Sequence, residues 1–250
     1  EAEKATADII EALNAIEASG VRANVSIKLT QIGLAVDPGL CQSNLVRIVK
    51  HAQSLSNFVR VDMEDSPVTQ ITLDLMRAAR AEAHNVGIVI QSYLYRSEED
   101  IAGLMKDGIT VRLCKGAYLE PASVAFPKKA DVDANYDRLV DALYQGSLAN
   151  GQPRLSADGR FPPIPGLATH DEKRVTYARQ AAARLNLPKD ALEFQMLNGI
   201  RRDLQENLAK EGYPVRVYVP YGTEWYPYFM RRLAERPANV WFMISIFFRR

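Results

Sequence analysis

Cysteine, histidine and excess charge are all scarce in this chain of 250 residues. Its two cysteines, Cys41 and Cys114, lie far apart, so they indicate no disulfide framework and are typical of a reducing compartment. The three histidines form no HExxH or other closely spaced zinc motif, and we expect no metal site. The 31 Lys and Arg against 30 Asp and Glu leave a net charge of +1, which excludes the basic footprint of a nucleic-acid-binding protein.

Long hydrophobic runs and paired glycines are also missing. The longest apolar run, residues 240–248 (VWFMISIFF), is too short to cross a bilayer, and we expect it to pack on the core. Contact with a membrane surface or a partner is the alternative for this run. No two glycines lie two residues apart, so the GxG turn of dinucleotide-binding open sheets never occurs.

Short apolar strands alternate with helical segments along the whole chain, which is typical of βα units around a parallel sheet. A first helix is predicted over residues 5–18, with Gly20 ending it. Asp37 and Ser66, each followed by proline, are predicted helix N-caps, and Ser97 with Asp100 approximates a capping box. The predicted strands are residues 25–29, 58–62, 87–91, 110–113, 166–169, 192–195 and 215–219.

Seven strands are one fewer than a (β/α)8 barrel contains. Because the fingerprint of the doubly wound sheet is missing, we predict an α/β fold of the (β/α)8 TIM type. We expect a single catalytic domain over residues 1–250 that lacks the barrel's first strand and N-terminal helices, with a C-terminal helix over the strand ends. Residues 150–165 are rich in Pro, Gly and Ser and are predicted to form a surface loop rather than a linker.

The segment that follows the last predicted strand carries an adjacent arginine pair. On a helix, Tyr228, Arg231, Arg232 and Glu235 occur at i, i+3, i+4 and i+7, and therefore share one face. Two guanidinium groups can bind a small carboxylate bidentately, which predicts a pocket for a small acid. Alternatively, the arginines complement the helix C-terminus and face water.

Polar side chains also follow every predicted strand, where a barrel places its functional groups. Each has a plainer explanation: Lys28 could be a solvated strand residue, and Asp171 a helix cap. Together they make a site for a polar ligand the better interpretation. They are Lys28, Asp62, Glu64, Asp65, Gln91, Tyr93, Arg112, Lys115, Tyr118, Thr169, His170, Asp171, Glu193, Gln195, Tyr218 and Tyr221.

Seven segments in order resemble the proline dehydrogenase family, in its short monofunctional bacterial form. They are SIKLTQIGL (26–34), VRVDMEDS (59–66), GIVIQSYLYR (87–96), VRLCKGAYLEP (111–121), ATHD (168–171), EFQMLNG (193–199) and the stretch from VRVYVPYG to WYPYFMRRLAERP. The resemblance implies a flavin-dependent barrel that oxidises L-proline to Δ1-pyrroline-5-carboxylate by hydride transfer to FAD, and that passes electrons to a quinone-type acceptor.

The resemblance also implies roles for individual residues. Asp62 and Arg112 would be catalytic, with Asp62 beside the proline amine and Arg112 at flavin N5. The proline site would comprise Lys28, Tyr218, Tyr228, Arg231, Arg232 and Glu235. The FAD site would comprise Met63, Gln91, Arg112, Lys115, Gly116, Ala117, Thr169, His170 and Gln195.

The resemblance implies a cytoplasmic enzyme with peripheral contact to the inner membrane and a pyrroline-carboxylate dehydrogenase as partner. Two other functions stay open on the residues alone. One is a lyase that uses Lys28 or Lys115 as a Schiff-base amine. The other is a non-catalytic, truncated barrel that binds a small carboxylic acid.

Overall fold

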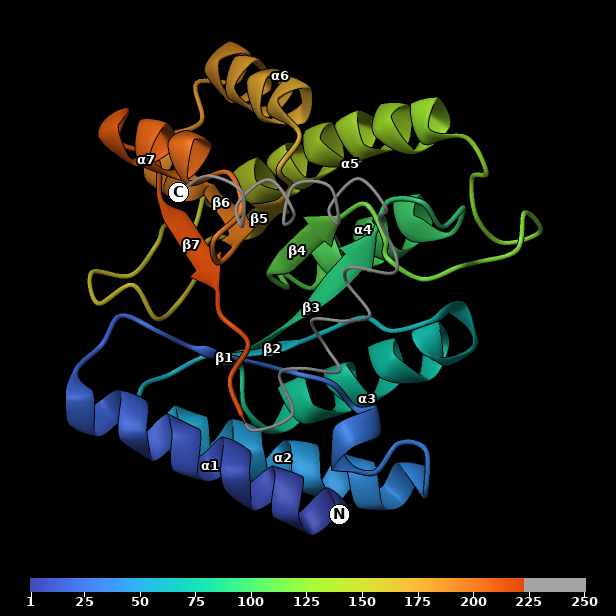
Figure 1. Ribbon diagram of the computed structural model, residues 1–250, viewed down its shortest axis with the longest axis vertical. Coiled ribbons are helices and arrows are strands. Elements are labelled where there is room, and N and C mark those ends of the chain that lie inside the picture. The colour runs from blue at the N-terminus through green and yellow to red at the C-terminus, as the bar shows by residue number, and fades with distance from the viewer. Residues whose placement is uncertain (223–250) are drawn as a thin grey trace, which may run out of the picture.

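The computed structural model describes residues 1–222. In that part of the chain seven parallel strands form one sheet in the order of the sequence (Figure 1). The strands are β1 (Val25–Ile27), β2 (Val59–Val61), β3 (Val86–Gln91), β4 (Val111–Cys114), β5 (Pro165–Ala168), β6 (Glu193–Leu197) and β7 (Val215–Tyr218). Every predicted strand is confirmed to within two residues at either end.

Helices connect the strands and cover the outer face of the sheet. They are α1 (Ala2–Ser19), α2 (Pro38–Ser54), α3 (Thr69–Glu82), α4 (Ser97–Lys106), α5 (Lys129–Ala149), α6 (Glu172–Arg184) and α7 (Arg202–Lys210). In the described part of the chain, three 3-10 turns lie in the connections: η1 (Thr30–Ile32), η2 (Ser66–Val68) and η3 (Lys189–Ala191). In the view of Figure 1, α1, α2 and α3 lie below the strands, and α5, α6 and α7 lie above them.

Some helix ends are determined by neighbouring residues, whereas at others a predicted cap is bound elsewhere. Gly20 ends α1 in a left-handed conformation, and Asp37 caps α2 by accepting hydrogen bonds from the backbone of residues 39 and 40, both as predicted. The predicted caps at Ser66 and Ser97 are wrong. The Ser66 hydroxyl donates to Glu120, and the Ser97 hydroxyl donates to the carbonyl of Gln91 at 2.5 Å.

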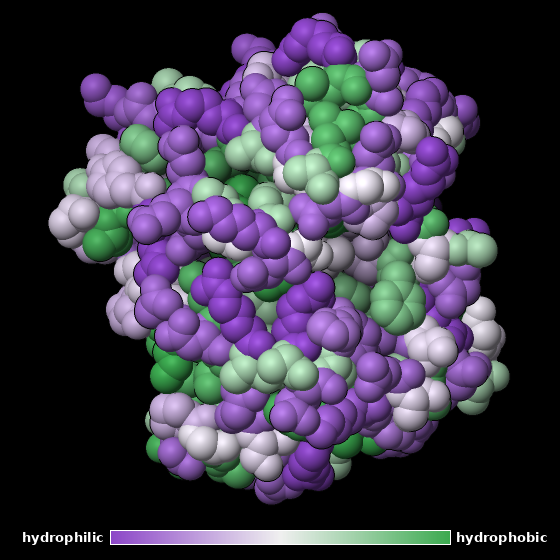
Figure 2. All heavy atoms as spheres, turned by 180° about the vertical axis from the view of Figure 1, so that it is seen from behind, coloured by the Kyte–Doolittle hydropathy of each residue, from purple (hydrophilic) through white to green (hydrophobic). Residues whose placement is uncertain are grey.

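Alternate residues of each strand face the helices and form a continuous apolar core. Val59 and Val61 of β2, Ile88 and Ile90 of β3 and Phe194 of β6 are at most 2% exposed within this core. Seen from behind, the outside of the molecule is mostly hydrophilic, with small scattered hydrophobic patches (Figure 2). Apolar burial therefore stabilises the helix-facing side of the sheet.

The other side of the sheet faces the barrel interior, and it is polar. Barrel interiors are usually filled with branched aliphatic side chains. Here Arg60, Arg112 and Glu193 point inward, and space for them comes from glycine. A Cβ at Gly87 would lie 2.7 Å from an Arg60 nitrogen, and one at Gly166 would lie 2.7 Å from the Gln195 amide nitrogen.

Contacts across this interior show how strongly the sheet is curled. The Tyr218 hydroxyl at the end of β7 lies 3.2 Å from Asp62, which follows β2, and Arg112 on β4 donates to Ser26 on β1 at 2.9 Å. Side chains from opposite strands could not meet across a flat sheet. The fold is therefore the predicted TIM-type barrel, of which seven strands lie within residues 1–222.

The predicted surface loop at residues 150–165 closes the N-terminal end of the barrel. Asn24, just before β1, donates to the carbonyl of Arg160 at 2.8 Å, and Arg216 of β7 donates to the carbonyl of Gly159 at 2.8 Å. The Phe161 ring meets Phe58, just before β2, edge to face at 6.1 Å between ring centroids. This loop leaves the opposite end, where the strands finish, for a ligand.

Candidate active site at the strand ends

Asp62 is the centre of a polar cluster at the carboxyl ends of the strands. One carboxylate oxygen accepts hydrogen bonds from Ser26 at 2.6 Å and Arg112 at 3.0 Å, and the other accepts from Lys28 at 2.8 Å and Tyr218 at 3.2 Å. These partners come from β1, β4 and β7 or the residues that follow them. The structure therefore brings together Lys28, Asp62, Arg112 and Tyr218 as predicted.

Ser26 was not among the predicted site residues. It lies two positions before Lys28, so the two-residue period of a strand places both side chains on one face. That period was the available signal. Its neighbours on the strand, Val25 and Ile27, pack on the apolar core instead.

Charge and burial compete at Asp62. Its burial raises the pKa of the carboxyl, but the charges of Lys28 and Arg112 and the hydrogen bonds from Lys28 and Ser26 together bring that pKa below its usual value. Burial acts to lower the pKa of Lys28, and the Asp62 carboxylate, aided by Tyr218, outweighs it and raises that pKa. Both groups are therefore charged at neutral pH.

Among residues 1–222, positive charge exceeds negative charge on the inward-facing side chains. The cations of this part of the chain are Lys28, Arg60, Arg112 and Arg216, and the anions are Asp62 and Glu193. Arg60 is 1% exposed, and burial, followed by the charge of Arg112, lowers its pKa. An interior with two surplus cations favours a ligand that is negative or becomes negative during reaction.

Gln91 and Gly116 form a second part of the site. The side-chain oxygen of Gln91 is buried and accepts no hydrogen bond among residues 1–222. Gly116 has φ 113°, and a Cβ there would lie 2.5 Å from the Tyr93 ring. Buried polar groups are normally satisfied, so the Gln91 amide is suited to the polar edge of a bound ring such as a flavin pyrimidine. The oxygen of Gln91, unpaired within the described residues, therefore fits the predicted FAD site, because a flavin ring could donate a hydrogen bond to it. Met63, 5% exposed after β2, and Ala117, beside Gly116, lie at the same strand ends.

Lys115 is held between carboxylates at the starts of α5 and α6. Its amine donates to Asp133 at 2.5 Å and to Asp171 at 2.6 Å. Burial acts to raise the pKa of Asp171, but the hydrogen bond and charge of Lys115 hold it at about 2. A phosphate would therefore have to compete with two carboxylates for Lys115.

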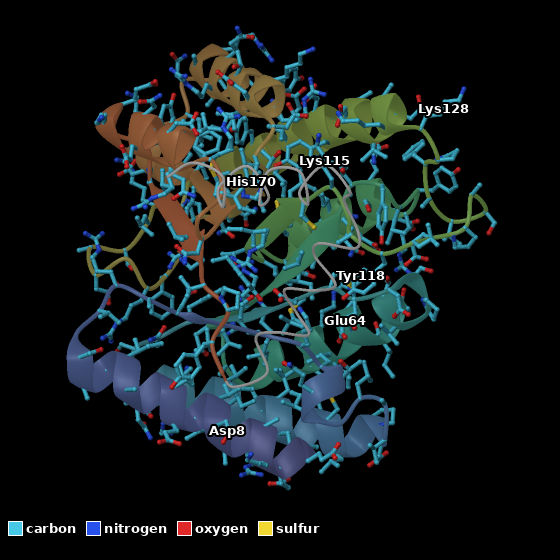
Figure 3. The ribbon with its side chains drawn as sticks, viewed as in Figure 1. Asp8, Glu64, Lys115, Tyr118, Lys128 and His170 are labelled. Atoms are coloured by element: carbon cyan, nitrogen blue, oxygen red, sulfur yellow. The ribbon has the colours of Figure 1, made fainter. Side chains whose placement is uncertain are left out.

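Thr169 and His170 organise the turn after β5. The Thr169 hydroxyl accepts a hydrogen bond from the backbone of Asp171 at 3.1 Å, and His170 Nε2 accepts one from the backbone of Leu197 at 2.9 Å. Asp171 caps α6, as the alternative interpretation of this residue had it. Figure 3 shows His170 and Lys115 near the middle of the view, with Tyr118 and Glu64 below them, while Asp8 and Lys128 lie at the periphery.

Gln195 lies between Arg112 and Glu193. Its side-chain oxygen accepts from Arg112 Nε at 2.5 Å, and its nitrogen donates to Glu193 at 2.6 Å. Arg216 in turn donates to both Glu193 oxygens at 2.8 Å. Arg216 was not predicted in the site, although it lies two positions before Tyr218 and the two-residue period of a strand places both side chains on one face.

The loop after β4 is tied across the strand ends by Glu120, which was also not predicted. Its carboxylate accepts from the backbone of Ser66 at 2.7 Å and from the Ser66 hydroxyl at 2.5 Å. Tyr118, on the same loop, is partly buried, and that burial raises its pKa while the charge of Lys28 opposes the shift. The loop thus brings an aromatic side chain toward the Asp62 cluster.

Several predicted residues lie outside residues 1–222. They are Tyr228, Arg231, Arg232, Glu235 and the apolar run 240–248. Within residues 1–222, no group of three or more His, Cys, Asp or Glu side chains is arranged to hold a metal ion. Over the same residues, no helix is both long and apolar enough to span a bilayer.

Comparison with known proteins identifies relatives along almost the whole chain. Residues 1–245 match the family described as Proline dehydrogenase. The chain is 44% identical to a proline dehydrogenase of Deinococcus radiodurans over 244 residues, which are 95% of this chain and 74% of the relative. It is 40% identical to proline dehydrogenase 2 of Bacillus subtilis (strain 168) over 241 residues, 96% of this chain and 75% of the relative.

Solved structures show the same fold. Proline utilization A from Bdellovibrio bacteriovorus, inactivated by N-propargylglycine, superposes with a TM-score of 0.80 at 26% identity over 93% of this chain. The match spans 28% of that longer protein. The proline utilization A of Bradyrhizobium japonicum, at 22% identity and a TM-score of 0.78, agrees in fold alone.

Proposed function

This chain belongs to the proline dehydrogenase family, and on that premise we propose that it oxidises L-proline to Δ1-pyrroline-5-carboxylate with bound FAD. The observation that carries the proposal is the Asp62 cluster, in which Lys28, Arg112 and Tyr218 surround one carboxylate at the strand ends. A bound flavin would supply the oxidation by accepting a hydride from the carbon next to the proline nitrogen.

The cations of the site have the chemistry to hold the proline carboxylate. Lys28 retains its charge because Asp62 raises its pKa. We propose that Lys28 acts with Arg231 and Arg232, whose planar forks suit bidentate binding of a carboxylate. Fixing the carboxylate places the adjacent ring carbon, and such positioning removes much of the entropic barrier to reaction. Tyr218, Tyr228 and Glu235 would line and close this pocket.

Asp62 acts electrostatically rather than as the base. A general base works best with a pKa near the working pH, whereas the pKa of Asp62 lies below its usual value. Its carboxylate would face the proline nitrogen and stabilise the positive charge that grows there as the imine forms. The surplus of cations in the barrel favours a substrate amine that has already lost its proton.

Arg112 and Gln91 would contact the flavin ring. Arg112, at the centre of the barrel, would stabilise negative charge on the reduced ring. Gln91 would satisfy its buried oxygen by accepting from the pyrimidine edge. Met63, Lys115, Gly116, Ala117, Thr169, His170 and Gln195 would hold the rest of FAD or support the residues that do.

The lyase alternative conflicts with the state of the lysines. A Schiff-base lysine must be neutral to attack, and such lysines have lowered pKa values. Asp62 instead raises the pKa of Lys28, and Lys115 is bound by Asp133 and Asp171. Neither amine is prepared for attack on a carbonyl.

The fate of the electrons and product is also proposed from the family. We expect a quinone-type acceptor, and residues 240–248 are the segment through which a cytoplasmic enzyme would reach the inner membrane. A pyrroline-carboxylate dehydrogenase would consume the product. Proline utilization A proteins, of which this chain matches about a quarter, are longer chains that have room for such a second enzyme.

An absorbance spectrum of the purified protein tests the proposal directly. We expect flavin bands that bleach when L-proline is added without oxygen. Flavin bands indifferent to L-proline would refute the substrate. A protein that binds no FAD would refute the flavoenzyme and favour the non-catalytic barrel.

A further inference from the structure

The barrel interior contains a buried ion pair that the reaction itself does not require. Arg216 donates from Nε and Nη2 to the two oxygens of Glu193, each at 2.8 Å. Glu193 is 1% exposed. Arg216 is itself held in place, because it also donates to the carbonyl of Gly159, in the loop that closes the N-terminal end of the barrel.

Glu193 determines how the Gln195 amide is turned. A side-chain amide can place either its oxygen or its nitrogen toward a neighbour. A carboxylate paired with arginine only accepts, so Glu193 requires the nitrogen of Gln195, which it binds at 2.6 Å. The amide oxygen is then left facing Arg112, whose Nε only donates and lies at 2.5 Å.

Arg112 is oriented in turn by this contact. With Nε bound to Gln195, Nη1 of the same planar guanidinium reaches Ser26 at 2.9 Å and Asp62 at 3.0 Å. Gly166 keeps the relay compact, because a Cβ there would meet the Gln195 nitrogen at 2.7 Å. The contacts form one directed chain from the closed end of the barrel to Asp62.

We propose that Glu193, held by Arg216, is a positioning residue that sets the Gln195 amide and thereby the guanidinium plane of Arg112 at the reacting centre. The catalytic part of this proposal rests on the proposed function, since Glu193 would act through Arg112 on the reduced flavin. The structural part, that Glu193 orients the Arg112 guanidinium, does not depend on the proposed function. A purely structural ion pair is the competing explanation.

Exchanging the side chains of Glu193 and Gln195 distinguishes a positioning role from a purely structural ion pair. In Glu193→Gln the remaining oxygen turns to Arg216, the new amide nitrogen faces Gln195, and Gln195 turns its own nitrogen toward Arg112. Arg112 then loses its acceptor. The double variant Glu193→Gln/Gln195→Glu conserves the net charge and returns a carboxylate to Arg112, but it leaves Arg216 without its bidentate partner.

The flavin midpoint potential and the rate of flavin reduction by L-proline are the readouts. For Glu193→Gln we expect slower flavin reduction by L-proline and recovery of the rate in the double variant, which has the net charge of the wild type. Because the loss of an anion by itself favours a reduced, more negative flavin, the potential is compared in Gln195→Met, which changes no charge; there we expect the reduced flavin to be disfavoured about tenfold, a fall of about 30 mV for two electrons. An unchanged rate in Glu193→Gln, or a double variant no faster than the single one, would show that the pair is only structural.

Two further measurements keep the test decisive. Gln195→Met breaks the relay but spares the ion pair, and it should lower the potential and slow the reduction even if Glu193→Gln folds poorly. No change in either quantity would overturn the proposal. Crystal structures of the variants report the Arg112–Asp62 contact without flavin. If the wild type binds no FAD, the proposed function fails, and the relay stands only if that contact is lost in Glu193→Gln and restored in the double variant.

Discussion

The coupling between Lys28 and Asp62 is the sharpest quantitative test of the site. Asp62→Asn removes the charge while keeping the shape, and Lys28→Met removes the amine while keeping most of the aliphatic stem. The single and double variants form a cycle whose non-additivity measures the pairwise interaction. The free energy of unfolding in urea, at a fixed saturating FAD concentration, is the measured quantity.

The expected size follows from geometry and exposure. The two groups lie 2.8 Å apart, and their side chains are 27% and 11% exposed. At that distance the attraction is about 6 kcal/mol with an effective dielectric constant of about 20, and about 1.5 kcal/mol in water. Because Lys28 is partly exposed, solvent screens the attraction to a value between these two, and we expect a coupling of about 2–3 kcal/mol.

The single variants should differ in cost. Asp62→Asn leaves Lys28 and Arg112 without their shared anion, and removing one partner of a buried ion pair costs about 3–5 kcal/mol. Lys28→Met should cost less, because Asp62 keeps its bonds to Arg112, Ser26 and Tyr218.

The pH dependence of the coupling has a defined sign. The pKa of Asp62 is lowered from 3.8, so its contribution is present above that value and is lost as pH falls through the folded-state pKa. The pKa of Lys28 is raised from 10.5, so its contribution is present below that value and is lost only as pH rises through the folded-state pKa. The coupling should therefore be constant from about pH 5 to about pH 9.

An exposed pair provides the control. Lys50 and Glu82 lie 2.7 Å apart with side chains 52% and 53% exposed. The cycle with Lys50→Met and Glu82→Gln should give a much smaller coupling, because solvent screens the attraction between exposed charges. A Lys28–Asp62 coupling no larger than this control, or one that grows as pH falls below 4, would refute the reasoning.

Further predictions concern the cofactor turn, an acidic residue and the arginine pair. Gly116→Ala should lose FAD affinity and about 1–3 kcal/mol of stability, because φ 113° and the nearby Tyr93 ring oppose a Cβ. Gly151→Ala is the control for backbone strain alone, because Gly151 has φ 78° and no atom of the described residues lies within 4 Å of a Cβ there. Equal losses of FAD affinity in the two variants would contradict the prediction. Burial raises the pKa of Asp137 to about 6, so the contribution of this residue to stability should fall as pH rises from 4 to 6. Relative to the wild type, Asp137→Asn should therefore gain up to about 1 kcal/mol of stability in urea over that range, given its partial exposure. Arg231→Lys and Arg232→Lys should each weaken proline binding by about 1–3 kcal/mol, and an unchanged KM in both would exclude a role in binding the carboxylate.

Local sequence patterns accounted for the strands and for some helix ends. The strands were predictable because a two-residue apolar period and flanking turns are properties of neighbouring residues. The Asp37 cap was predictable for the same reason, since its partners lie two and three residues away. Ser66 and Ser97 carry the same local signal, but Glu120 and the Gln91 carbonyl bind their hydroxyls instead.

The membership of the site followed largely from strand ends, but its pairings did not. Parallel strands finish at one end of a barrel, so residues such as Lys28, Asp62 and Arg112 could be placed together from sequence position alone. The sequence contained no information on which of these residues would form hydrogen bonds with one another. Those choices depend on the curl of the sheet, which brings β7 across to Asp62.

By itself, the sequence determined the order of the elements, the polar character of the strand ends and, through seven matching segments, the family. Only the tertiary structure decided that residues 150–165 close one end of the barrel, that Lys115 is bound by two carboxylates and that Glu193 directs Arg112 through Gln195. The physical reason is range. Backbone propensities act over a few residues, whereas most of these partners, such as Arg112 and Gln195, lie tens of residues apart and are brought together by closure of the sheet.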